Sequence, residues 1–259
     1  ENINLIAQAK AIHATALTLD AHADIEIPGK PSSYVGRDGL SKVAPSKMHA
    51  GGLNAVVMAV AVGPMPRNTA GYAAAAKLAQ IKLEAVKMLA TDKTNNSVIV
   101  LSTDDLITAH KEGKSALLLG FQNALILGTE IDGINDLYSS GVRVFALTHM
   151  GHNDFADSSR TLFNGDNGRR EPDAEHGGLS TLGKAAIKKI NLLGGIMDIS
   201  QLSSQAALQA IELSVTPVIA SHSNVRTLTD VSRNLSDEEI DRIGETGGVI
   251  NIAPFRGYL

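Results

Sequence analysis

A His-x-Asp pair follows the first apolar run of the chain, and its two side chains could together bind a metal ion. The run covers residues 16–19, and the pair is His22 and Asp24. Alternate residues of a strand point to the same side, so an imidazole and a carboxylate at this spacing can converge on one cation. By itself the pair also fits a buried histidine followed by an aspartate that caps the next element.

Later apolar runs end in polar side chains in the same way. These side chains are Gln122 after residues 116–121, His149 after 142–148, and His222 after 217–221. Metal ligands of α/β barrels sit at the carboxyl ends of strands, so the repeated pattern favours metal binding. Because His149 lies at a strand end, a functional role is favoured over the role of a buried core histidine. His152 and Asn153 could equally line the pocket or lie in a solvated loop.

Buried strands alternate with helices along the chain. Continuous apolar runs predict main strands over residues 16–24, 54–62, 116–121, 142–149, 194–200, 217–223 and 247–253, with a short accessory strand over 97–101. Helical spacing predicts helices over residues 2–16, 71–90, 102–113, 131–139, 180–193, 203–213 and 236–246. The first helix is expected to pack beneath the first strand. Long loops over 25–45 and 150–178 are expected at the working end of the fold.

This alternation is typical of a parallel α/β fold, and the number of strands suggests that the sheet closes into a barrel. Seven main strands are one fewer than a (β/α)₈ barrel contains. An open seven-stranded sheet would leave an apolar edge without a partner. We therefore predict one TIM-type barrel domain over residues 1–259, with its last strand and helix beyond Leu259.

Composition limits the partners of the chain. Its 259 residues carry a net charge of −4, which provides no basic surface for nucleic acid. The apolar runs are shorter than a bilayer requires, so no membrane span is predicted. Cysteine is absent, so a metal ion must be bound by imidazole, carboxylate or amide groups. The start at Glu1 rather than Met favours export, for instance to the periplasm, over a cytoplasmic location.

Several motifs, in order along the chain, resemble those of the renal (membrane) dipeptidase family of amidohydrolase-like metal-dependent hydrolases. They are Asp20-Ala21-His22-Ala23-Asp24, Leu147-Thr148-His149, Ala156-Asp157-Ser158-Ser159, Gly178-Leu179-Ser180-Thr181-Leu182-Gly183, and Ser221-His222-Ser223 with Arg233-Asn234-Leu235-Ser236-Asp237. The likeness covers essentially the whole chain, which resembles a divergent, bacterial-type member. It implies a (β/α)₈ barrel in which two zinc ions and a hydroxide cleave the amide bond of a dipeptide.

The resemblance also implies roles for individual residues. His22 and Asp24 match ligands of the first metal ion, and His222 matches a ligand of the second. His149 matches the histidine that steadies the tetrahedral oxyanion. Arg233 matches the arginine that holds the substrate carboxylate, a role that suits the two-pronged guanidinium.

Two positions depart from the family pattern. Gln122 stands where the family has its bridging glutamate, and Gln201 stands where it has a histidine ligand. A neutral amide brings no charge and only one good donor oxygen, so it cannot bridge two dications as a carboxylate does. His22 and Asp24 with the amide oxygen of Gln122 would hold one zinc ion, so we expect one ion rather than two.

The predicted function is zinc-dependent hydrolysis of a small dipeptide or related amide. His152 and Asn153 are expected to bind substrate beside Arg233. Two alternatives stay open: a divergent member that processes another small amide, as in natural-product maturation, and a non-catalytic binding protein. Family members often pair, which leaves a homodimer open.

Overall fold

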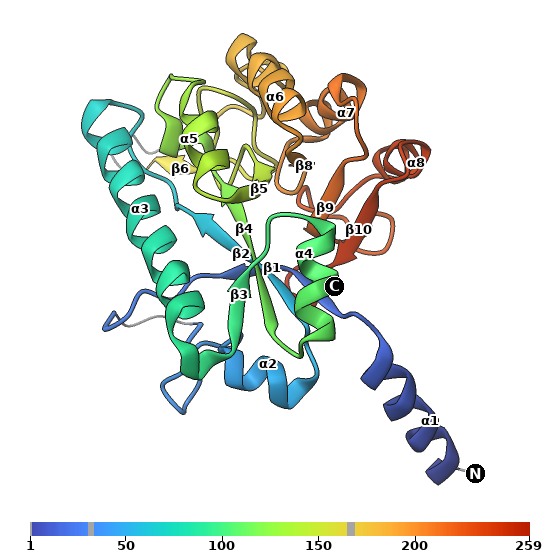
Figure 1. The fold of residues 1–259 in the computed structure, drawn as a ribbon. Helices are drawn as coiled ribbons and strands as arrows, with labels where there is room; N and C mark the ends of the chain where they lie inside the picture. The colour runs from blue at the N-terminus through green and yellow to red at the C-terminus, as the bar shows by residue number, and fades with distance from the viewer. Residues whose placement is uncertain (1, 31–33, 165–168) are drawn as a thin grey trace.

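Parallel strands form a curved sheet with helices around it, and the sheet nearly closes into a barrel (Figure 1). The computed structural model describes residues 2–30, 34–164 and 169–259. Neighbouring strands are all parallel and follow the order β1-β2-β4-β5-β8-β9-β10. Their bounds are β1 Leu19–Asp24, β2 Ala55–Ala61, β4 Ser115–Gln122, β5 Val142–Ala146, β8 Ile196–Asp198, β9 Ile219–Ser223 and β10 Val249–Ile252. The predicted TIM-type fold class is confirmed.

The predicted accessory strand is also present, but it is not one of the strands that form the barrel. It is β3 (Ser97–Ile99), which pairs with residues 115–117 at the beginning of β4. β2 occupies one side of β4 along its whole length, and β5 pairs with residues 119–122 on the other side. β3 therefore lies below β5 on the same side of β4.

Most helices lie outside the strands, and serine side chains cap four of the eight described α-helices. Ser102, Ser180, Ser203 and Ser236 each accept a hydrogen bond from a backbone N–H of the first turn. The helices are α1 Asn2–Thr15, α2 Pro45–Gly51, α3 Thr69–Thr91, α4 Thr103–Lys111, α5 Gly133–Ser139, α6 Thr181–Leu193, α7 Ser204–Leu213 and α8 Asp237–Glu245, with 3₁₀ turns η1 Lys93–Asn95 and η2 Ala124–Leu127.

The first helix forms as predicted, but its predicted packing beneath β1 is wrong. α1 points away from the barrel (Figure 1), and its side chains of Leu5, Ile6 and Ile12 are 62%, 57% and 69% exposed. Apolar spacing predicts that a helix forms and does not specify which surface covers it. β1 is also less buried than expected, and Leu19 is 44% exposed, because β1 pairs with β2 on one side only among the described strands.

Two elements, one after the predicted 25–45 loop and one within the 150–178 loop, were not expected from the sequence. α2 begins at Pro45, the helix position where the missing proline N–H costs nothing. A short antiparallel hairpin of β6 (Phe163–Asn164) and β7 (Arg169–Arg170) forms within the 150–178 loop. Residues 31–33 and 165–168 of these two predicted loops lie outside the described residues.

The main core fills the space between the strands and the surrounding helices. Its largest fully buried side chains include Phe121 of β4, Phe145 of β5, and Ile187 and Ile190 of α6. The packed strands therefore serve as a rigid base for the side chains at their carboxyl ends.

Among the described residues no helix combines the length and the apolar character needed to cross a bilayer.

Candidate active site

The register of the sheet brings the predicted site residues to one end of the barrel. Gln122 at the end of β4 is opposite Ala146 of β5, which is opposite Asp198 at the end of β8. Asp24 ends β1, and His222 lies one residue before the end of β9. The carboxyl ends of parallel strands thus form a common floor, as the repeated strand-end pattern predicts.

A cavity of about 340 Å³ opens above this floor. Five of the eight predicted site residues line it, namely His22, Asp24, Gln122, His149 and His222. The other lining residues are Tyr34, Met150, Arg160, Gln201, Ala253, Phe255 and Tyr258. Arg233, His152 and Asn153 are not among the lining residues.

Two histidines that line the cavity lie against each other. The rings of His22 (β1) and His222 (β9) stack with 3.9 Å between their centroids and 20° between their planes. Burial is the main cause that lowers the pKa of both rings, and it outweighs the effect of nearby carboxylates on His22. Both rings are therefore neutral near pH 7, which is the form that binds a metal ion.

A chain of hydrogen bonds orients the His222 ring. The buried Asp198 carboxylate accepts bonds from the backbone N–H groups of Ser200 and Ser221 and, at 2.5 Å, from the Ser221 hydroxyl. Ser221 Oγ also lies 2.7 Å from Nδ1 of His222. Because the hydroxyl proton points to Asp198, Nδ1 of His222 donates to Ser221, and Nε2 keeps its lone pair. Gln201 Nε2 lies 3.3 Å from that Nε2 and donates to it.

Gln122 is the residue that could complete a metal-binding set with His22 and Asp24. Gln122 is buried, and its amide nitrogen has no hydrogen-bond partner. A half-turn of the amide would place its oxygen there, beside His22 and Asp24, as a neutral third ligand. Among the described residues no three His, Asp or Glu side chains gather into a metal-binding cluster.

His149 lies three residues beyond β5 and faces the same cavity. Its backbone carbonyl accepts a hydrogen bond from the Ser158 hydroxyl, which anchors the turn, whereas Nδ1 is buried without a partner. Burial, as the main cause, lowers the pKa of His149 to about 4. At pH 7 the ring is a neutral imidazole that can donate one hydrogen bond into the cavity.

Arg233 is buried next to the cavity rather than lining it. Its Nη1 donates to Ser223 Oγ at 2.9 Å and its Nη2 to the His222 carbonyl at 2.5 Å, whereas Nε has no partner. Burial lowers the pKa of Arg233 to about 10, so the guanidinium is still charged at neutral pH. The ring of Tyr258 lies 5.4 Å from the guanidinium carbon.

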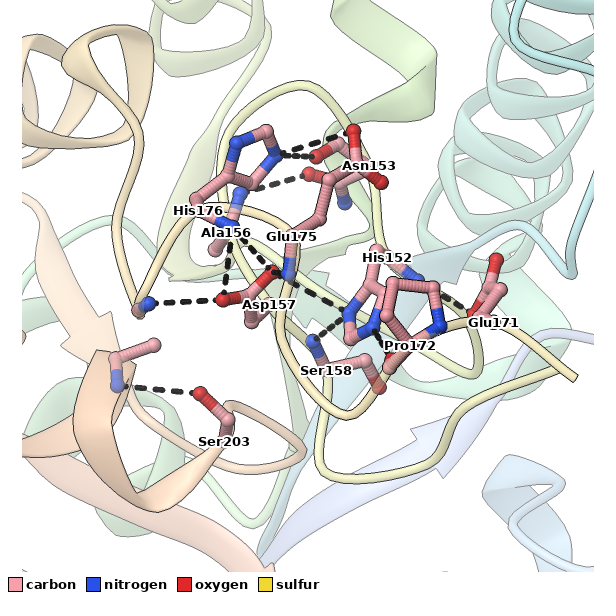
Figure 2. Close-up of polar contacts among 12 residues, drawn as sticks. His152, Asn153, Ala156, Asp157, Ser158, Glu171, Pro172, Glu175, His176 and Ser203 are labelled. Atoms are coloured by element: carbon pink, nitrogen blue, oxygen red, sulfur yellow. Dashed lines mark hydrogen bonds and ion pairs between the residues drawn. The ribbon is translucent and has the colours of Figure 1, made fainter.

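His152 and Asn153 have structural roles in the described structure, which differs from the prediction that they line the pocket. Figure 2 shows their network. His152 Nε2 donates to the Pro172 carbonyl at 2.8 Å, and its Nδ1 accepts from the Ser158 N–H at 3.0 Å. Asn153 Nδ2 donates to the Leu147 carbonyl at 2.7 Å. Both side chains form hydrogen bonds that shape the loop, because a buried polar group needs a hydrogen-bond partner nearby.

Asp157 is the centre of this loop network (Figure 2). Its carboxylate accepts hydrogen bonds from the backbone N–H groups of Glu175, His176 and Gly178, at 2.8–3.1 Å. Burial alone would raise the pKa of Asp157, but these donors hold the pKa below its usual value. Asp157 thus ties residues 175–178 to the segment that carries Arg160.

Sequence reasoning missed several residues of the cavity. Asp198 does not line the cavity but orients His222, and it lies inside the predicted strand over 194–200, at the end of the observed β8. Its polar side chain near a strand end is the signal that could have found it. Arg160, Tyr34 and Tyr258 lie in loops without periodicity, and nothing in the local sequence indicates that they face the cavity.

A parallel-strand barrel with histidine, aspartate and amide groups at the carboxyl ends of its strands defines a metal-dependent hydrolase type of site. The chain belongs to the membrane dipeptidase family (peptidase family M19), whose sequence profile it matches over residues 6–259. An uncharacterised dipeptidase of Schizosaccharomyces pombe is 31% identical over 179 residues, which cover 69% of this chain and 41% of that protein. Dipeptidase tcpJ of Claviceps purpurea is 31% identical over 58% of this chain and 33% of its own length.

Solved structures share the fold. The probable dipeptidase PvdM from Pseudomonas aeruginosa superposes with a TM-score of 0.90 and 33% identity, over 100% of this chain and 65% of that one. A metallo peptidase from Rhodobacter sphaeroides, liganded with a phosphinate mimic of the dipeptide L-Ala-D-Ala, has a TM-score of 0.74 and 19% identity, over 91% of this chain and 73% of that one. The chain thus spans less than half of the two fungal relatives and about two thirds of these structures.

Proposed function

We propose that this chain forms the catalytic barrel of a metal-dependent hydrolase that cleaves the amide bond of a small dipeptide. The observation that carries the proposal is the convergence of His22, Asp24, Gln122 and His149 on one cavity at the carboxyl end of the barrel. Family membership favours this function over the processing of another amide or a non-catalytic binding role, both of which the sequence left open. Export and homodimer formation stay predictions.

His22, Asp24 and Gln122 would hold one zinc ion. When bound, such an ion supplies Lewis-acid polarisation of an amide carbonyl and a source of hydroxide near neutral pH. The neutral state of His22, which its burial favours, leaves a ring nitrogen free to act as a ligand.

His149 and Arg233 would position the substrate. A neutral imidazole at His149 can donate a hydrogen bond to the carbonyl oxygen as negative charge develops on it, and it needs no proton from solvent to do so. Arg233 would attract the terminal carboxylate of the dipeptide through its charge, with Nε as the donor that has no partner in the structure.

The test is hydrolysis of a dipeptide panel by the full natural protein in zinc-supplemented buffer, with the zinc content per chain measured in parallel. We expect turnover with about one ion per chain. His149→Asn should lower kcat about 100-fold because a donor to the oxyanion is lost. His13→Asn, an exposed histidine of α1, is the matched control and should retain full activity. Absence of turnover for every dipeptide would contradict the proposal.

A further inference from the structure

A second arginine reaches the cavity, and neither the family motifs nor the proposed function uses it. Arg160 lines the cavity with His149 and Tyr258. Its Nη1 donates to the Tyr258 hydroxyl at 3.1 Å. In the part of the chain that the structure describes, Arg160 forms no ion pair with a carboxylate, whereas Arg67 pairs with both Asp154 and Glu175. Arg160 is therefore a cation at the cavity wall with no anionic partner.

The backbone of Arg160 is held in place by the loop beneath it. The Arg160 N–H donates to Ser158 Oγ at 3.1 Å, and its carbonyl accepts from the Gly151 N–H at 2.8 Å. Ser158 in turn is tied to His152 in the network that Asp157 centres (Figure 2). A fixed backbone lowers the entropic cost of a hydrogen bond from the side chain.

Arg160 and Arg233 both contact Tyr258, from different sides. Arg160 binds the hydroxyl, and the Arg233 guanidinium carbon lies 5.4 Å from the ring. The positive charge of Arg160 also contributes to the lowered pKa of Arg233, after burial as the main cause. Asp24 is the one carboxylate among the described residues that line the cavity, and its proposed role is metal binding. Asp198 lies close enough to Arg233 to oppose the lowering of its pKa, but the Asp198 carboxylate is engaged by Ser200 and Ser221. Among the described residues, Arg160 forms no ion pair, and Arg233 has no carboxylate within ion-pair distance.

We propose that Arg160 is a specificity-determining residue that selects dipeptides with an acidic C-terminal residue, such as Asp or Glu. Arg233 takes the α-carboxylate and Arg160 takes the side-chain carboxylate. The two arginines share Tyr258, so the two carboxylates that they bind must lie close together, on one residue rather than at opposite ends of the dipeptide. A guanidinium suits this role because its planar donors match a carboxylate. The inference rests on the proposed function.

The experiment compares Ala-Glu with Ala-Gln, two substrates of nearly equal shape that differ in one negative charge, in the full natural protein with zinc. Each is tested with both stereoisomers of its second residue. We expect a higher kcat/KM for Ala-Glu, and Glu-Ala, with its charge at the other end, should gain no such advantage. Arg160→Gln should lower kcat/KM for Ala-Glu about tenfold, the effect of one charge-assisted hydrogen bond. The same variant should lower kcat/KM for Ala-Gln less than for Ala-Glu, so the ratio of the two values should fall.

Two further variants separate charge at this position from charge in general. Arg160→Lys should retain part of the preference for Ala-Glu because it keeps the charge and loses the planar fork. Arg242→Gln changes the net charge by the same amount on α8, where Arg242 pairs with Glu245 at the surface, and should leave the preference unchanged.

Each outcome decides between the two proposals. Turnover of dipeptides with equal kcat/KM for Ala-Glu and Ala-Gln, or an unchanged ratio in Arg160→Gln, would overturn the role of Arg160 and leave the hydrolase proposal standing. Absence of all turnover would overturn the hydrolase proposal. Calorimetric binding of phosphinate analogues of Ala-Glu and Ala-Gln would then test Arg160 directly, and equal affinities would refute its role.

Discussion

The amide nitrogen of Gln201 lies 3.3 Å from Nε2 of His222, the ring atom that would have to face a second metal ion. Nδ1 of the same ring is engaged by Ser221, so both nitrogens of His222 have protein partners. A neutral hydrogen bond thus takes the place that a metal–imidazole bond would need. Together with Gln122 at the floor of the cavity, this contact is the basis of our proposal that the site binds one ion.

Restoring charged and imidazole ligands should create a second metal site. We expect the double variant Gln122→Glu with Gln201→His to bind two zinc ions per chain, because a carboxylate can bridge two cations and a second imidazole supplies a strong ligand. The measurement is elemental analysis after equilibrium dialysis against buffered zinc. Gln8→Glu, on exposed α1, adds the same charge as control and should bind no additional ion. A double variant that holds no more zinc than the parent would mean that these residues are misplaced.

Removal of the Ser221 hydroxyl should release the His222 ring. Ser221→Ala leaves the Asp198 carboxylate and His222 Nδ1 without a shared partner, so the free energy of unfolding should fall by about 1–3 kcal/mol. The ¹⁵N chemical shifts of the ring should change from those of an Nδ1-protonated tautomer to those of a mixture. Ser221→Thr retains a hydroxyl and should preserve the tautomer, and Ser214→Ala on a partly exposed turn serves as the stability control. Unchanged ring shifts in Ser221→Ala would refute the proposed orientation.

The Asp157 carboxylate should dominate the stability of the 150–178 loop. Asp157→Ala removes the common acceptor of three backbone N–H groups, and we expect it to cost about 3 kcal/mol in urea unfolding. Asp173→Ala, an exposed aspartate of the same loop, should change stability by less than about 0.5 kcal/mol. Equal effects of the two substitutions would show that the network in Figure 2 does not hold the loop.

Acid should destabilise the metal-free protein through His149. The unfolded chain takes up a proton near pH 6.5, whereas the folded ring does so only near its pKa of about 4. Between these values the unfolded state binds more protons, so stability falls as the pH drops from about 6.5 to 4 and then levels off, a total of about 3 kcal/mol from this group. Urea unfolding in the presence of a chelator measures the slope. His149→Gln should reduce the slope in this window, and an identical slope in that variant would assign the effect to other groups.

The sequence by itself determined most of the segments that become strands and helices. Apolar runs predicted the strands of the barrel and helical spacing predicted its helices, with α2 and the β6–β7 hairpin as the exceptions. It also indicated that residues such as His22 and Asp24 share one end of the barrel. These features depend on residues that are close together in the sequence, through strand periodicity, helix capping and the parallel direction of the strands.

The tertiary structure alone decided which polar side chains face the cavity. His152 and Asn153 resembled pocket residues in the sequence but are consumed by hydrogen bonds within their own loop, whereas Arg160, in the same loop, reaches the cavity wall. It likewise decided that α1 stands away from the barrel. The direction of a loop side chain depends on contacts with segments far away in the chain. A local sequence pattern does not specify those contacts.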